Sequence, residues 1–132
     1  MMVARPKPWE ALKAVDTVTL TFERPPSVNA LYRNVPGVGR AKTLAAKTWA
    51  KTAELQIMTQ RPGGVRGRYH MTIIAERSSE LADLDNIIKA TGDLLKACGV
   101  IQDDRLCESL EASWRGRGTS LSVRVTSHPN TI

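Results

Sequence analysis

Five acidic residues and a lysine lie close together in the second half of the chain, in an order that could build a metal-dependent active site. They are Asp83, Asp85, Lys89, Asp93, Asp103 and Asp104. A hard cation such as Mg2+ takes carboxylate oxygens, and its usual protein site combines one or two of them with substrate phosphate and water. The pair Asp83 and Asp85 fits that need, so the sequence indicates a site that handles phosphate groups.

The helix predicted over residues 85–97 would place three of these side chains on one side. Asp85, Lys89 and Asp93 stand at i, i+4 and i+8, while the apolar residues that face the core are Ile87, Ile88, Leu94 and Leu95. Asp83 precedes the helix, where an extended backbone could bring its carboxylate near Asp85. Lys89 could orient an attacking water or stabilise the charge that develops in the transition state.

Asp104 is the best candidate for a third carboxylate because it opens the strand that follows the helix, and Asp103 is a further candidate ligand. Either residue can reach the site only if the helix packs against the sheet. A simpler interpretation stays open, in which Asp83 or Asp85 is only an N-cap and Asp103-Asp104 is only a turn. Asp85 and Lys89 would then form a surface ion pair worth ~0.3–0.5 kcal/mol.

Charge is unevenly distributed along the 132 residues, whose formal net charge is +6. Residues 1–80 carry 13 Lys and Arg against 6 Asp and Glu, whereas residues 81–132 carry 6 against 7. A basic protein with one acidic segment is typical of an enzyme that binds a polyanion and holds a cation at its reacting phosphate. The same charge could also serve solubility alone.

Hydrophobic periodicity predicts about four strands and two main helices in a single domain. The core should span about residues 16–126, with flexible N-terminal and C-terminal tails. We expect strands over 15–23, 66–76, 106–114 and 121–125, and helices over 44–60 and 85–97. Thr43 is the expected N-cap of the first helix, and Gly99 the expected stop of the second. The short run 115–119 favours a hairpin between the last two strands.

Residues 25–43 are rich in Pro, Gly and Asn and read as a long loop. The loop carries an aromatic residue and three cations, and these could follow a phosphate backbone and stack on a base: Tyr32, Arg33, Arg40 and Lys42. A solvated connection with a few charges explains the composition equally well.

Cys98 and Cys107 do not form a CxxC pair, and His70 and His128 have no partner at zinc-ligand spacing. We therefore expect no zinc site and no disulfide, and we expect Cys98 to be a reduced thiol in the core. No stretch has the length or apolarity of a signal sequence or a membrane span, so a cytoplasmic protein is expected.

The acidic segment resembles the signature of the RusA family of Holliday junction resolvases, which prophages often carry. The matching run is Asp83-Leu84-Asp85-Asn86-x-x-Lys89-Ala90-x-x-Asp93-x-Leu95, followed by Gly99-Val100-x-x-Asp103-Asp104. An earlier run, Pro25-Pro26-Ser27-x-Asn29-x-x-Tyr32-Arg33, is similar to the family's opening motif. The likeness covers about residues 16–126.

The resemblance implies an α+β fold, with a small mixed sheet of about four strands and two main helices. It also implies a homodimer that cuts branched DNA, such as a four-way junction, in recombination and repair. It implies Mg2+ as the cofactor, with Mn2+ as a substitute, held by Asp83, Asp85 and Asp104, with Lys89 as the essential lysine. It also adds Asn29 to the DNA-binding residues of the loop. Known members carry basic and sometimes aromatic residues before the Asp-Leu-Asp-Asn run, whereas this chain has Ser78-Ser79-Glu80-Leu81-Ala82.

Two other functions stay open. The chain could be a phage DNA-binding protein that keeps the fold without turnover, although the acids are intact. It could also be a Mg2+-dependent phosphohydrolase that acts on small nucleotides, although it has no Gly-rich phosphate loop of the Walker type.

Overall fold

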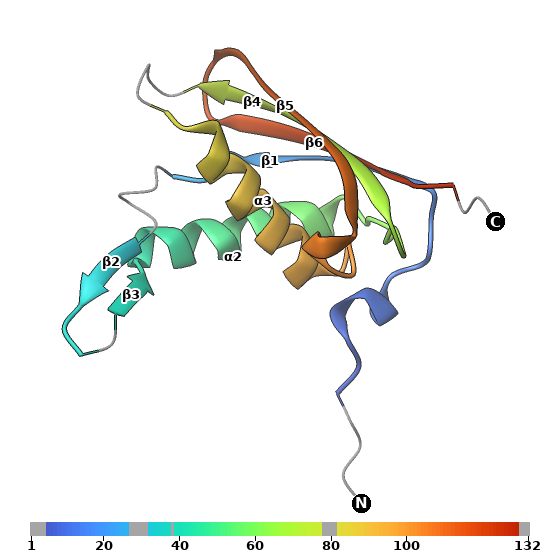
Figure 1. Cartoon of the computed structure of the whole chain (residues 1–132), viewed down its shortest axis with the longest axis horizontal. Helices are drawn as coiled ribbons and strands as arrows, with labels where there is room; N and C mark the ends of the chain where they lie inside the picture. Colours follow the sequence, from blue (N-terminus) through green and yellow to red (C-terminus); the bar gives the residue numbers. More distant parts are fainter. Residues whose placement is uncertain (1–4, 27–31, 38, 78–81, 130–132) are drawn as a thin grey trace, which may run out of the picture.

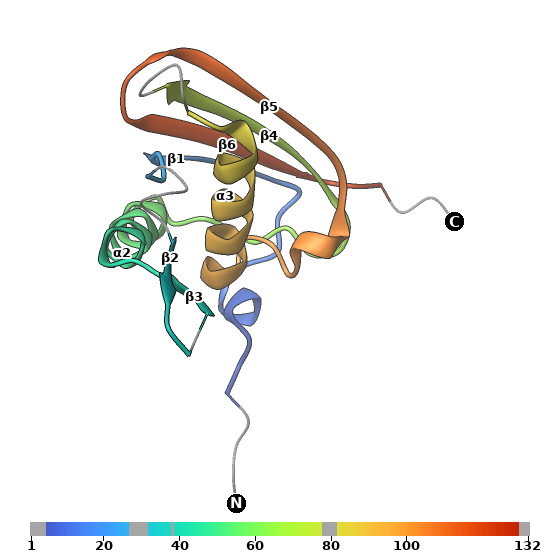
Figure 2. The same ribbon diagram turned by 60° about the vertical axis from the view of Figure 1, so that its left-hand side comes forward.

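The computed structural model describes residues 5–26, 32–37, 39–77 and 82–129, with only the backbone for 32–35 and 39–42. The expected α+β fold is confirmed, because a four-stranded mixed sheet carries two helices on one face (Figures 1 and 2). The sheet strands are β1 (Thr17–Glu23), β4 (Tyr69–Arg77), β5 (Cys107–Arg117) and β6 (Ser120–Ser127). The helices are α2 (Leu44–Thr59) and α3 (Leu84–Cys98). Two short 3-10 helices are η1 (Pro8–Ala11) and η2 (Asp104–Leu106).

The strand order is β1-β6-β4-β5, so the hairpin expected between the last two strands is wrong. β4 lies between them, parallel to β5 and antiparallel to β6. The link at Gly118 crosses the end of β4: its N–H donates to the Arg77 carbonyl at 3.3 Å, and the Ser120 N–H donates to Glu76 Oε1 at 3.0 Å. A side chain at Gly118 would collide with the Glu76 carboxylate. The alternation of residues in a strand predicts which side chains share a face, but it does not predict which strand lies beside it. The local sequence therefore could not show that β4 separates β5 from β6.

The caps of both helices follow the sequence closely. The Thr43 hydroxyl accepts the Ala46 N–H at 3.1 Å at the start of α2, as expected. Gly99 ends α3 with φ of 85°, a left-handed conformation that favours glycine. An ideal Cβ on Gly99 would lie 2.5 Å from the Pro8 carbonyl oxygen, so η1 can pack here only against a glycine. The segment before residue 16, expected as a free tail, therefore contains a packed element.

The segment expected as a loop over 25–43 contains a short antiparallel hairpin. It is formed by β2 (Tyr32–Val35) and β3 (Gly39–Lys42), and its register pairs Tyr32 with Lys42 and Arg33 with Ala41. Four-residue strands are too short for a period-two pattern to stand out from the Pro, Gly and Asn around them. The hairpin projects away from the sheet at one end of α2 (Figure 1).

One hydrophobic core fills the space between the sheet and the two helices. The inward residues of β1, β4 and β6 are buried, whereas the alternate residues of β1 are exposed. Cys98 is a free, buried thiol, as expected, and its burial raises its pKa to about 11. Within the described ranges, no helix has the length and apolarity to cross a bilayer.

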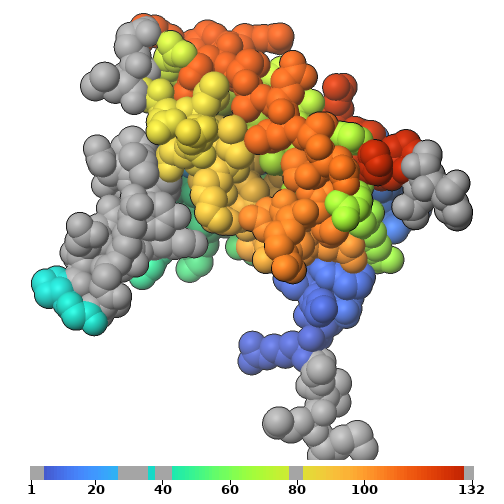
Figure 3. Space-filling model, in the orientation of Figure 1, coloured from blue at the N-terminus to red at the C-terminus, as the bar shows by residue number. Residues whose placement is uncertain are grey.

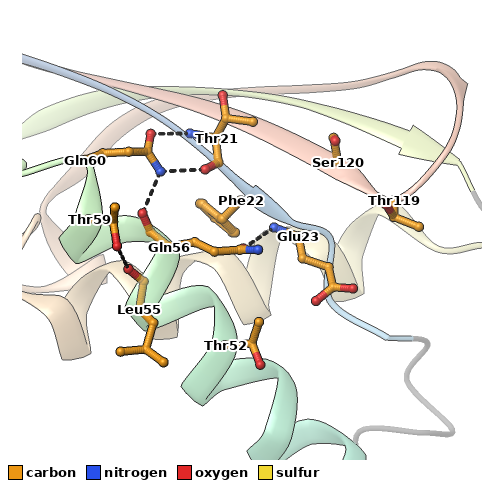
Figure 4. A pocket seen from close by; sticks show the side chains of 10 residues that line it. All are labelled: Thr21, Phe22, Glu23, Thr52, Leu55, Gln56, Thr59, Gln60, Thr119 and Ser120. Atoms are coloured by element: carbon orange, nitrogen blue, oxygen red, sulfur yellow. Dashed lines mark hydrogen bonds between the residues drawn. The ribbon is translucent and has the colours of Figure 1, made fainter.

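Side chains of α2 cap the outer edge of β1 (Figure 4). Gln60 accepts the Thr21 N–H at 3.1 Å and donates to the Thr21 carbonyl at 2.7 Å, while Gln56 accepts the Glu23 N–H at 2.8 Å. The Trp49 indole N–H donates to the Glu23 carbonyl at 2.7 Å. An edge strand with unpaired backbone groups invites pairing with other chains, and these contacts occupy that edge.

We predict that Gln60→Ala lowers the free energy of unfolding by about 1–2 kcal/mol, because it removes three hydrogen bonds of modest net value, two to Thr21 and one to the Gln56 carbonyl. It should also increase aggregation, since it exposes the β1 edge. Urea unfolding and light scattering measure the two effects. Lys51→Ala, on an exposed position of the same helix, is the matched control and should change neither. Equal behaviour of the two variants would contradict the capping role.

Candidate active site

A cavity of about 250 Å³ lies between α3 and the first residues of β4 and β5. Asp85 and Lys89 line it from α3, and Asp104 lines it from η2. The remaining lining residues are Tyr69, Met71, Ile88, Gly92, Cys107 and Leu110. Three of the four predicted catalytic residues therefore meet at one cavity, although Asp104 is distant from the other two in sequence.

Topology brings Asp104 to the helix. The parallel pairing of β4 with β5 sets Tyr69 beside Cys107, so the turn before β5 must return to the starting end of β4. That turn is η2, which lies beside α3 in both ribbon views (Figures 1 and 2). An ideal Cβ on Gly92 would lie 4.0 Å from the Asp104 Cβ, which is ordinary van der Waals contact. Gly92 therefore lies beside Asp104 in the lining of the cavity.

Asp83 does not line this cavity. It is the N-cap of α3, and its Oδ1 accepts the Asp85 N–H at 2.9 Å. The capping role considered from the sequence is therefore present. The contact fixes the first turn of α3, which carries Asp85.

Asp103 also faces away from the cavity and lines a neighbouring hollow, as does Asp93. Asp103 caps η2 by accepting the Arg105 N–H at 3.0 Å, and it pairs with the Arg105 guanidinium at 3.3 Å and with the Lys96 Nζ at 3.5 Å. The backbone N–H of Arg105 first, and then its guanidinium, hold the pKa of the Asp103 carboxyl far below its ordinary value. Asp93 pairs with the Lys89 Nζ at 3.3 Å.

Tyr69 and Cys107 were missed by the sequence analysis. The Tyr69 side chain is almost fully buried, and its pKa is raised well above the ordinary value, first by burial and then by the charges of Cys107 and Asp104. The Cys107 Sγ donates to the Ser109 carbonyl at 3.2 Å, and burial raises its pKa too. A tyrosine and a cysteine at the starts of two strands give no local signal, because only the strand pairing makes them neighbours.

The ligands that line the cavity meet part of what a Mg2+ site needs. Asp85 and Asp104 supply two carboxylates at one cavity, which is the number that Mg2+ usually takes from protein when phosphate and water fill its other positions. Across the described part of the chain, no group of three His, Cys, Asp or Glu residues is close enough to hold a metal ion.

The predicted DNA-binding residues fall on the hairpin and the segment before it. Asn29 lies outside the described residues, as do Ser78 to Leu81. Tyr32 is on β2, and Arg40 is on β3. The Asn86 Nδ2 donates to the Pro26 carbonyl at 3.0 Å, so the first turn of α3 anchors the chain that leads to the hairpin.

Comparison with known protein families finds no family model that matches this chain. Comparison with curated proteins finds no matching sequence either.

We predict that Gly92→Ala raises the free energy of unfolding by about 0.5–1 kcal/mol, because glycine inside a helix costs that much relative to alanine. The new methyl group meets only the Asp104 Cβ at an ordinary distance. Chemical denaturation measures the change. A loss of stability would show that the space beside Gly92 is smaller than the structure indicates.

We predict that Asp103→Asn destabilises the protein at neutral pH, because it removes the carboxylate that pairs with Arg105 and Lys96. The folded pKa of Asp103 lies below its unfolded value of about 3.9, so the stabilisation is complete above that value and is lost as the pH falls below it. The difference between parent and variant should therefore shrink below about pH 4. Asp16→Asn, at an exposed position, is the control, and thermal unfolding across pH 2–7 is the measurement. A difference that does not change with pH would contradict the ionic origin.

Proposed function

We propose that this protein is a metal-dependent endodeoxyribonuclease of the RusA type that hydrolyses phosphodiester bonds in branched DNA. The observation that carries the proposal is the meeting of Asp85, Lys89 and Asp104 at one cavity. The motif resemblance assigns essential roles to these three residues. The spacing of the three residues in the sequence does not by itself bring them together, because the position of Asp104 depends on the order of the strands in the sheet.

In the proposed reaction, the carboxylates of Asp85 and Asp104 would hold Mg2+. When bound, this ion lowers the pKa of a water ligand and neutralises charge on the phosphate. Water attacks phosphorus, the bond from phosphorus to the 3′ oxygen breaks, and the departing oxygen takes a proton to leave a 3′-hydroxyl and a 5′-phosphate. Lys89, at the rim of the cavity, adds positive charge to the phosphate as negative charge builds up in the transition state.

The size of the cavity favours a polymeric substrate over a small nucleotide. Pockets that enclose small ligands have volumes of about 300–1,000 Å³, whereas this cavity has a volume of about 250 Å³. A phosphodiester of DNA needs to present only its phosphate here. The excess of Lys and Arg over residues 1–80 supports a polyanionic partner.

The substrate geometry that we propose also implies a dimer. Resolving a four-way junction requires cuts in two opposed strands, and a two-fold homodimer places two identical sites in that relation. Such an enzyme would act on DNA in the bacterial cytoplasm.

We predict that Asp85→Asn and Asp104→Asn each reduce cleavage of a labelled four-way junction in Mg2+ by roughly a hundredfold or more, because each removes a charged ligand. Lys89→Ala should reduce the rate by about 10²–10³-fold. Asp16→Asn is the matched control and should cut like the parent, and EDTA should abolish the activity.

Three outcomes would contradict the proposal. Parental rates in both Asp variants would exclude this site, and a preference for linear duplex would exclude branch selectivity. Tight DNA binding without cleavage in Mg2+ or Mn2+ on any branched or flapped substrate would favour a non-catalytic DNA-binding protein.

A further inference from the structure

A second hollow adjoins the proposed catalytic cavity. It has a volume of about 680 Å³ and lies between η1, the last turns of α3 and the chain that leads to η2. Asp93 and Asp103 line it, and they stand one helical turn after Lys89 and one residue before Asp104. In the space-filling view, the blue surface of the η1 segment meets the orange surface around η2 (Figure 3). A strand whose phosphate lies at the cavity would therefore place a neighbouring nucleotide near this hollow.

Trp9 forms the aromatic wall of the hollow. The backbone of Pro8 and Trp9 rests on Gly99, and the Arg66 guanidinium lies 5.3 Å from the centre of the Trp9 ring. Arg66 is itself held by a 3.1 Å hydrogen bond to the Leu12 carbonyl. Trp9 is only half-buried and does not belong to the core. A large aromatic side chain that is held in place without being buried is suited to stacking against a ligand.

The polar groups around Trp9 match the needs of a nucleotide. The Gln102 Oε1 accepts the Gly67 N–H at 2.7 Å, which fixes the side-chain amide whose N–H groups can donate to a base. The Asp93 carboxylate, which pairs with Lys89, can also accept from an exocyclic amino group. Lys7 supplies positive charge for phosphate, while Lys96 neutralises the Asp103 carboxylate that lines the same hollow. The volume of about 680 Å³ lies within the range of sites that enclose small ligands, unlike that of the catalytic cavity.

We propose that this hollow binds one unpaired nucleotide of the DNA substrate, with its base stacked on Trp9. The inference rests on the proposed nuclease function and adds a reason for branch selectivity. A base can reach the hollow only after leaving its own stack, which is easiest where the strands already diverge. Linear duplex would therefore reach the site poorly.

Binding of a single-stranded oligonucleotide that contains 2-aminopurine tests this proposal, with the full-length protein in EDTA so that no cleavage occurs. Parent protein should change the fluorescence of the stacked base. Trp9→Leu should abolish that change and weaken binding by about 5- to 150-fold, the contribution of one base stacked on an aromatic ring. Trp9→Phe, which keeps an aromatic ring, should retain most of both.

Trp114→Leu is the control, because Trp114 is also half-buried and also lies against an arginine, with Arg77 5.1 Å from its ring centre. Trp114, unlike Trp9, packs against the core, so thermal unfolding first establishes that this variant is folded. It should bind like the parent. Equal affinity and fluorescence for Trp9→Leu and the parent would overturn the stacking site. Cross-linking of a 5-iodouracil oligonucleotide to the parent protein needs no variant, and a cross-link that maps away from residues 7–9 would overturn it as well.

The cleavage assay separates this failure from failure of the nuclease. If Asp85→Asn binds the oligonucleotide like the parent and loses cleavage, the catalytic assignment holds, and the Trp9 variants alone decide the nucleotide site. If Asp85→Asn and Asp104→Asn cut like the parent, the proposed function fails, and with it the substrate role of the hollow.

Discussion

The parallel pairing of β4 with β5 is the constraint on which the candidate site depends. It requires the chain to travel back along the sheet before β5 can start, and α3 makes that return across the core face. The turn that opens β5 must then lie against α3, where Asp104 is beside Gly92. An antiparallel hairpin in place of this pair would have removed the reason for Asp104 to approach Asp85. The cavity is therefore a property of the strand order as much as of the acids.

The two acidic pairs, Asp83 with Asp85 and Asp103 with Asp104, show the same division between a capping residue and a residue that lines the cavity. In each pair the first acid caps a helical segment through the N–H two residues later, Asp83 at α3 and Asp103 at η2. A later acid in each pair, Asp85 or Asp104, lines the cavity. The capping role is thus compatible with the proposed catalytic role, because the capping acid fixes the backbone that carries the lining acid.

Local patterns were sufficient for some features and not for others. The period of the apolar residues predicted both helices and the four sheet strands, and the cap residues Thr43 and Gly99 were identified from their types. The spacing of Asp85 and Lys89 placed them on one helical side, because i and i+4 are neighbours on any helix. The positions of Asp104, Tyr69 and Trp9 depend on contacts between distant segments, so no pattern within one segment could predict them. The hairpin expected between the last two strands was wrong for the same reason, because the pairing of strands depends on the packing of the whole core.

The sheet order also governs when the protein can fold. β1 is the first strand of the described sheet along the chain, and in that sheet it pairs only with β6, which follows the other three strands. β6 in turn joins β1 to β4, so the core face cannot close until the C-terminal strand is available. Contacts between segments that lie far apart in a chain slow folding, because a long loop must close before they contribute. A chain emerging from the ribosome would therefore keep β1 without its partner until β6 had been made.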